Sequence, residues 1–220
     1  MSGITLKQTS EDPNCASIML CEGQHDYEFI GRLISKLGFS SYNLVDKIPK
    51  DKDKVISRVI NYGQLSYIPV IIEGGRSKLD GNVRLLISRL RSINGSFLRV
   101  IILRDADSND PDEAFNVLKS SIDNFINDPN RFPLHKPSIT CNKGSNVGQF
   151  ASYNCMLKYE NGNVVLKFII VVPSLESFLS KYSYINNKDN LNKAIDGALN
   201  DLTSVSMLNS VKRLFDPCFS

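Results

Sequence analysis

The sequence lacks a long hydrophobic run. No apolar stretch in the 220 residues approaches the roughly 20 that a membrane-spanning helix requires. The opening segment, MSGITLKQTSEDPN, also lacks the apolar core of a secretory signal. We therefore expect a cytoplasmic protein that does not contact a membrane.

Paired cysteines and clustered histidines are absent as well. The five cysteines are an odd number and widely spaced, they include no C-x-x-C pair, and the chain has two histidines. This pattern argues against a structural zinc site and against a disulfide framework. Most of the thiols are expected to be small buried hydrophobic side chains.

Internal repeats and Pro/Gly/Ser-rich linkers are not found either, so we expect a single domain over residues 1–220. Its α/β core should cover about residues 15–184, followed by a helical extension at about 185–220. An apolar share of 42%, a charged share of 22%, and eight Tyr with eleven Phe indicate a folded protein rather than a disordered one. The net charge of +3 permits an anionic partner without requiring one.

Short apolar runs alternate with segments of helical spacing. Glycine or acidic residues close the runs Cys15–Gly23, Tyr67–Gly75 and Phe97–Asp107, which predict buried strands, and 41–46 is a weaker strand candidate. Helices are predicted at 26–38, 51–64, 79–93 and 111–125. Alternation of this kind predicts a mainly parallel sheet with helices on both faces.

The second half of the chain has a different character. Residues 127–148 are rich in Pro, Asn and Gly, which predicts loops with one short strand near residues 138–141 and leaves the role of this segment open. Residues 151–173 predict a β-hairpin that turns at residues 160–163. Two or three helices are expected from Ser174 onward.

Acidic residues follow the ends of the strong strands. Glu22 follows the first strand, with Asp26 one helical turn onward, and Asp105 and Asp107 end the third. Ligands of open α/β sheets bind beyond the carboxyl ends of the strands. If the strands are parallel and adjacent, Glu22, Asp105 and Asp107 meet at one edge. His25 is expected to be a loop histidine without a function.

Asp105 and Asp107 form a D-x-D motif. Residues i and i+2 of an extended segment point the same way, so both carboxylates would face one cation. Mg²⁺ takes one or two protein carboxylates and completes its shell with water and phosphate oxygens. The alternatives are a solvated Asp pair that caps the next helix and, for Glu22, an exposed loop acid.

A glycine-rich turn precedes the helix predicted at residues 79–93. Backbone N–H groups at a helix start favour a phosphate, and Gly74, Gly75, Arg76 and Lys78 are the candidate phosphate-binding residues. The spacing is not that of a Walker motif. A tight turn with solvated cations is an equal alternative.

The order of these motifs resembles the Toprim domain. The matching residues are Glu22-Gly23 with Asp26, the turn Gly74-Gly75-Arg76-Ser77, and Asp105-x-Asp107. Topoisomerases, bacterial primases, small ribosomal-RNA maturation nucleases and overcoming-lysogenization-defect (OLD) nucleases share this domain. The segment VVPSLESFLSKY adds a Pro-x-x-Glu similar to that of stand-alone, OLD-like members, with Glu176 as a further acid. The resemblance covers roughly Ile18 to Tyr184.

The resemblance implies a Toprim-like (Rossmann-like) fold and a catalytic site built on Glu22 and Asp105. Glu22 would match the glutamate that acts as general acid/base or metal ligand, and Asp105 and Asp107 the pair that holds Mg²⁺ or Mn²⁺. Asp26 and Glu176 would match acids that help to bind a second metal. Two such metals activate a water and stabilise the leaving oxygen in phosphodiester cleavage.

Other parts of those families find no counterpart here. The sequence shows no winged-helix region with a nucleophilic tyrosine, no primase zinc segment and no Walker ATPase. The leading hypothesis is a metal-dependent nuclease that acts on DNA or RNA. The alternative is a non-catalytic nucleic-acid- or partner-binding module of a defence or repair system, and either reading allows a protein partner or a homo-oligomer. A nucleotide-sugar transferase also uses D-x-D but leaves Glu22 and Glu176 unexplained.

Overall fold

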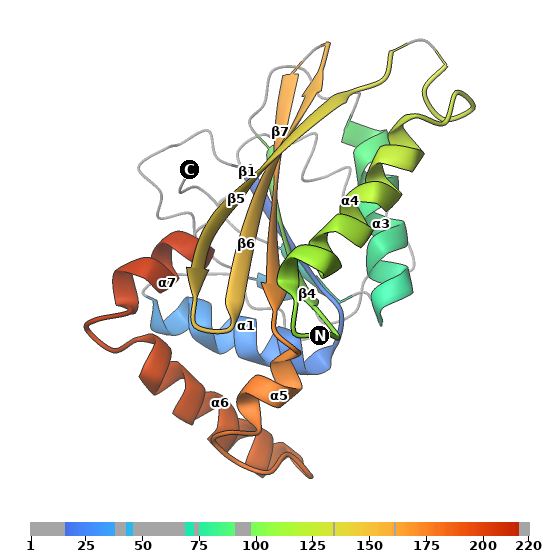
Figure 1. Ribbon diagram of the computed structural model, residues 1–220. Helices are drawn as coiled ribbons and strands as arrows, with labels where there is room; N and C mark the ends of the chain where they lie inside the picture. Colours follow the sequence, from blue (N-terminus) through green and yellow to red (C-terminus); the bar gives the residue numbers. More distant parts are fainter. Residues whose placement is uncertain are drawn as a thin grey trace.

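The computed structural model describes residues 16–37, 43–45, 69–72, 75–90, 98–133, 135–160 and 162–215. They form one sheet with helices on both faces (Figure 1). The strands are β1 (Ala16–Cys21), β2 (Asn43–Val45), β3 (Pro69–Ile72), β4 (Leu98–Asp105), β5 (Ser138–Val147), β6 (Phe150–Tyr159) and β7 (Gly162–Val171). The helices are α1 (Gln24–Lys36), α3 (Arg76–Leu90), α4 (Pro111–Ile126), α5 (Leu175–Leu179), α6 (Lys188–Leu202) and α7 (Leu208–Phe215). The helix predicted at 51–64 lies outside the described residues.

The seven strands follow the order β2-β3-β1-β4-β7-β6-β5. Neighbouring strands from β2 to β7 pair in parallel, whereas β6 pairs antiparallel with β7 and β5 with β6. The α/β class and the mainly parallel sheet expected from the sequence are therefore confirmed. Parallel pairing places the carboxyl ends of β3, β1, β4 and β7 at the same edge.

The sheet separates two hydrophobic cores. Ile101 and Leu103 of β4 pack with α1, α5, α6 and α7, whereas Val100 and Ile102 pack with α3 and α4. This division follows from the strand period of two residues, since successive side chains point to opposite faces. A residue's position in β4 therefore decides which group of helices its side chain meets.

The ends of the helices agree with local sequence signals in one case and differ in another. α4 begins at Pro111 as predicted, and the Asp110 side chain accepts hydrogen bonds from the N–H groups of Asp112 and Glu113. α3 begins at Arg76, three residues before the predicted start at Leu79. Gly75 makes the early start feasible because its φ of +113° suits glycine alone and turns the chain directly into the helix.

Residues 138–147 form β5, a ten-residue strand paired with β6. The short strand predicted near residues 138–141 is therefore confirmed, and the prediction of loops is wrong for residues 142–147. Most side chains of β5 are exposed or half-buried, so a strand rich in polar residues and glycine resembles a loop in sequence. β5 and β6 form a second hairpin, with Val147 paired to Phe150 and Gly148 at a φ of +57° between them, and the polar composition of β5 conceals this hairpin in the sequence.

The same pairing joins two cysteines. Cys141 and Cys155 face each other in the register of β5 and β6, with Cα atoms 4.0 Å apart, and form a disulfide. The expectation of free thiols is wrong for this pair, because the antiparallel register decides which cysteines meet. Cys21 is buried and is not part of a disulfide, as expected.

The hairpin and the C-terminal helices are confirmed. β6 and β7 are joined through a tight turn, with Tyr159 paired to Gly162. The chain after Ser174 forms three helices, and apolar side chains of α6 and α7 belong to the same core as those of α1. Within the described ranges, no helix is both long enough and apolar enough to cross a membrane.

Candidate functional site

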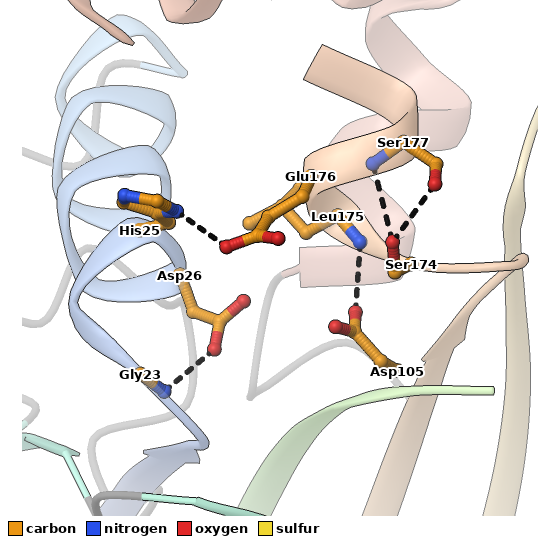
Figure 2. Close-up of polar contacts among 8 residues, drawn as sticks. All are labelled: Gly23, His25, Asp26, Asp105, Ser174, Leu175, Glu176 and Ser177. Carbon is orange, nitrogen blue, oxygen red and sulfur yellow. Dashed lines mark hydrogen bonds and ion pairs between the residues drawn. The ribbon is translucent and has the colours of Figure 1, made fainter. Parts of the chain in front are cut away.

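The carboxyl ends of β1 and β4 bring the predicted acids together. Leu20 pairs with Ile102, so Glu22, which directly follows β1, lies beside the end of β4. Asp105 is the last residue of β4, and its parity with Ile101 and Leu103 directs its side chain toward α1 and α5. The backbone N–H of Leu175 donates a 2.8 Å hydrogen bond to Asp105 Oδ1 (Figure 2). The first turn of α5 therefore orients this carboxylate.

Asp26 lies in the first turn of α1 and faces the same edge (Figure 2). Its Oδ2 accepts a 2.8 Å hydrogen bond from the Gly23 N–H, and the residue is only 8% exposed. Burial raises the pKa of the Asp26 carboxyl from 3.8 to about 7, and the charges of Asp105 and, more weakly, Glu22 contribute to this rise. The hydrogen bond from Gly23 opposes it. Asp26 is thus within electrostatic reach of both strand-end acids.

Glu22 is largely shielded from solvent at the end of β1. Its side chain is 17% exposed, and Oε1 is buried without a hydrogen-bond partner in the described part of the chain. Burial raises the pKa of the Glu22 carboxyl from 4.5 to about 7, with a further contribution from the charge of Asp105. The positive charge of Arg104 lowers it, and Asp107 adds a smaller rise. Both the protonated and the ionised form of this carboxyl are therefore accessible near neutral pH.

Asp107 has a different geometry from the one predicted. The extended strand ends at Asp105, and Asp107 has a left-handed φ of +56°. Its N–H donates to the Pro173 carbonyl oxygen at 2.8 Å, and the residue is exposed. The i, i+2 argument for parallel carboxylates does not apply to this pair, although the Asp107 charge still acts on Glu22.

Glu176 lies at the rim of this group. Its side chain is 68% exposed, and its Oε1 lies 2.9 Å from His25 Nδ1 (Figure 2). This contact joins the first turn of α1 to α5. His25, expected to be a loop histidine without a function, instead lies in α1 and contacts a predicted site residue.

The glycine-rich turn is only partly described. Gly74 lies outside the described residues, as does the side chain of Arg76. The Gly75 N–H donates a 2.8 Å hydrogen bond to the Glu22 carbonyl oxygen, so this N–H is not available to a phosphate. Lys78 is exposed in the first turn of α3.

Two residues that the sequence interpretation passed over also reach the site. Arg104 lies between the carboxylates of Glu22 and Asp80, with its Nη2 3.4 Å from Asp80 Oδ2. A signal for Arg104 was present, because an arginine in the aliphatic run VIILRDAD requires a buried anionic partner. Asp80 had no such signal, because acids are common on exposed helix faces.

The donor set suits a hard cation. Carboxylate oxygens are the ligands that Mg²⁺ prefers, and one or two of them are enough beside water and phosphate. Glu22 Oε1 has no hydrogen-bond partner among the described residues and lies 3.9 Å from Arg104 Nε, so the guanidinium neighbours this oxygen. Among the residues described, however, no three His, Cys, Asp or Glu side chains are arranged to hold one metal ion.

Comparison with protein-family models, with curated proteins and with solved structures finds no match for this chain.

Proposed function

We propose that this protein is a metal-dependent phosphodiesterase that acts on nucleic acid. The observation that carries the proposal is the convergence of Glu22, Asp26 and Asp105 at one sheet edge, where burial and mutual repulsion raise the pKa of two of them to about 7. Buried acids with coupled, shifted pKa values are more common at functional sites than elsewhere. A divalent cation would relieve the repulsion that this arrangement creates.

Each carboxyl group would have its own part in the reaction. Asp105, oriented by the Leu175 N–H, would be the first ligand of Mg²⁺ or Mn²⁺. Glu22 would be the second carboxylate ligand or would exchange a proton with the substrate. Its pKa of about 7 makes both the ionised and the protonated form accessible. Asp26, Asp107 and Glu176 would support the site from its periphery. The bound cation would supply Lewis-acid activation of water and charge neutralisation at the phosphate.

The proposed assignment at family level is a Toprim-like, Rossmann-like fold of the stand-alone OLD-like type. In its support, acids follow two adjacent parallel strands, and a further acid, Glu176, begins the helix after the neighbouring strand β7. A nucleic-acid substrate is what this resemblance implies, and the net charge of +3 permits it. The phosphate backbone of a nucleic acid is negatively charged, so it also suits a site that holds a cation.

The proposal is tested by incubating the full chain with single- and double-stranded DNA and RNA, with Mg²⁺, with Mn²⁺ or with a chelator. We expect cleavage that the chelator abolishes and that Glu22→Gln and Asp105→Asn each reduce at least 100-fold. Glu113→Gln is the matched control, because it neutralises an exposed acid near Asp105 in sequence but within α4. Cation-dependent cleavage that persists at full rate in both site variants would contradict the assignment.

A non-catalytic nucleic-acid- or partner-binding module is the second candidate. One observation favours it: no three potential ligands in the described residues are arranged around one metal position. In that case the chain would bind nucleic acid saturably, with the same dissociation constant in chelator and after Glu22→Gln. Electrophoretic mobility shifts under the two conditions separate the two candidates.

A further inference from the structure

Arg104 is a buried cation on the opposite face of β4 from Asp105. It is 2% exposed, and its parity with Val100 and Ile102 places its side chain toward α3 and α4. A guanidinium cannot lose its proton in a protein, so burial requires anionic partners that offset the cost of desolvation. The identity of those partners determines what this arginine does.

Two carboxylates approach the guanidinium from different elements. Asp80 Oδ2 of α3 lies 3.4 Å from Nη2, and Glu22 Oε1 lies 3.9 Å from Nε. Both side chains are largely shielded, at 21% and 17% exposure. The planar guanidinium presents donors along several directions and can serve two carboxylates at once. Two ion pairs that share Arg104 therefore connect Asp80 of α3, through β4, to Glu22 at the end of β1.

The backbone connects the same two segments. The Gly75 N–H donates a 2.8 Å hydrogen bond to the Glu22 carbonyl oxygen, and Gly75 immediately precedes α3. Asp80 lies little more than one helical turn further along. One short segment, residues 75–80, thus holds the Glu22 main chain directly and the Glu22 side chain through Arg104.

We propose that Asp80 and Arg104 are positioning residues that hold the Glu22 carboxylate at the acidic sheet edge. Asp80 fixes the guanidinium from α3, and the guanidinium in turn restrains Glu22 on the side facing away from Asp105. The inference rests on the proposed function, in which Glu22 serves the metal-dependent reaction. It assigns to the start of α3 a role in site geometry, in addition to any contact with phosphate.

The test compares Asp80→Asn, Arg104→Lys and Arg104→Met with Lys167→Met in the full chain. Lys167 is a suitable control, because it is another buried cation of the sheet, and its Nζ donates to the Arg213 carbonyl oxygen of α7. Binding of Mn²⁺ is followed by electron paramagnetic resonance at a single pH, together with the melting temperature. Both readouts are independent of hydrolysis.

We expect Asp80→Asn and Arg104→Met to weaken Mn²⁺ binding about 10-fold or more, as loss of an outer-shell partner does. Arg104→Lys should retain more of the affinity than Arg104→Met, and Lys167→Met should lower the melting temperature without weakening Mn²⁺ binding. If Asp80→Asn and Arg104→Met only lower the melting temperature, with affinity within about twofold of the parent chain, the two residues are merely structural. Asp80→Asn alone decides the matter if Arg104→Met does not fold.

The positioning role can also be tested if the proposed function is wrong. If the parent chain binds no Mn²⁺, crystal structures of the parent chain and of Asp80→Asn show where the Glu22 carboxylate lies. Displacement of that carboxylate from its place beside Asp105 supports the positioning role, and an unchanged position overturns it.

Discussion

Glu22 and Asp26 carry carboxyl groups that are costly to ionise. Both are buried beside Asp105, and both have a pKa raised to about 7. The folded protein therefore keeps protons that the unfolded chain releases near pH 4. These bound protons stabilise the folded protein. Their contribution is complete below the pKa values of the two carboxyls in the unfolded chain, and it is lost as the pH rises through about 7.

Replacement of Asp26 by Asn tests this linkage. Without metal, Asp26→Asn should raise the free energy of unfolding at pH 8 by on the order of 2 kcal/mol and change it little near pH 4. The reason is that the neutral amide removes one charge from the cluster yet still accepts the Gly23 N–H. Urea unfolding between pH 4 and pH 8 measures the difference.

The matched variant is Glu28→Gln, a carboxyl on the same helix that is not part of the acidic cluster. It should leave the pH dependence as it is in the parent chain. If the free energy of unfolding of Asp26→Asn changes with pH between pH 4 and pH 8 as steeply as that of the parent chain, the raised pKa is not a property of Asp26.

At the scale of elements, the start of α4 separates a capping role from a ligand role. Asp110 caps the helix through two backbone N–H groups, and Pro111 occupies the first position. The cap satisfies donors that the helix itself leaves open. The acids after the D-x-D motif thus belong to a helix terminus, whereas Asp105 belongs to the sheet edge.

Asp110→Ala should lower the free energy of unfolding by about 1 kcal/mol, the usual cost of removing such a cap. It should leave Mn²⁺ affinity within about twofold of the parent chain. Glu113→Gln, in the same helical turn, should change stability by no more than about 0.5 kcal/mol. Thermal unfolding measures the stability, and Mn²⁺ titration measures the affinity. A large loss of Mn²⁺ affinity in Asp110→Ala would show that Asp110 is part of the metal site.

At the scale of the whole molecule, the C-terminal helices are part of the main core. Figure 1 shows α6 and α7 beside α1, and α6 contributes Ile195, which is fully buried in the core that also holds residues of β1 and β4. The helices of the extension expected at about residues 185–220 therefore share a core with β1 and β4. Stability of the acidic edge should depend on these helices, because α1, which carries Asp26, packs in the same core as α6.

Ile195→Ala should lower the free energy of unfolding by roughly 2–5 kcal/mol, since it leaves a cavity beneath α1. Val205→Ala is the control, because Val205 is 98% exposed in the turn after α6, and it should cost no more than about 0.5 kcal/mol. Urea unfolding measures both. Equal stability of the two variants would show that α6 is an appendage rather than part of the core.

Prediction from the sequence succeeded where the determining interactions are local. The apolar runs predicted β1, β3 and β4, helical spacing predicted α1 and α4, and turn residues predicted the hairpin of β6 and β7. Prediction found only the first residues of β5, and it failed for the disulfide between Cys141 and Cys155, because the register of β5 and β6 decides which cysteines meet. A polar edge strand buries too little to leave a hydrophobic pattern.

The candidate site divides in the same way. The aliphatic runs alone predict that Glu22 and Asp105 lie at strand ends, because an acid after such a run marks the end of a buried strand. The fold is needed to show that β1 and β4 are neighbours, that Asp107 leaves the extended conformation, and that Arg104 lies between Glu22 and Asp80. These are matters of strand order, backbone conformation and packing between segments far apart in the chain. A single sequence does not record the distances between such segments, and the chemistry of the site depends on those distances.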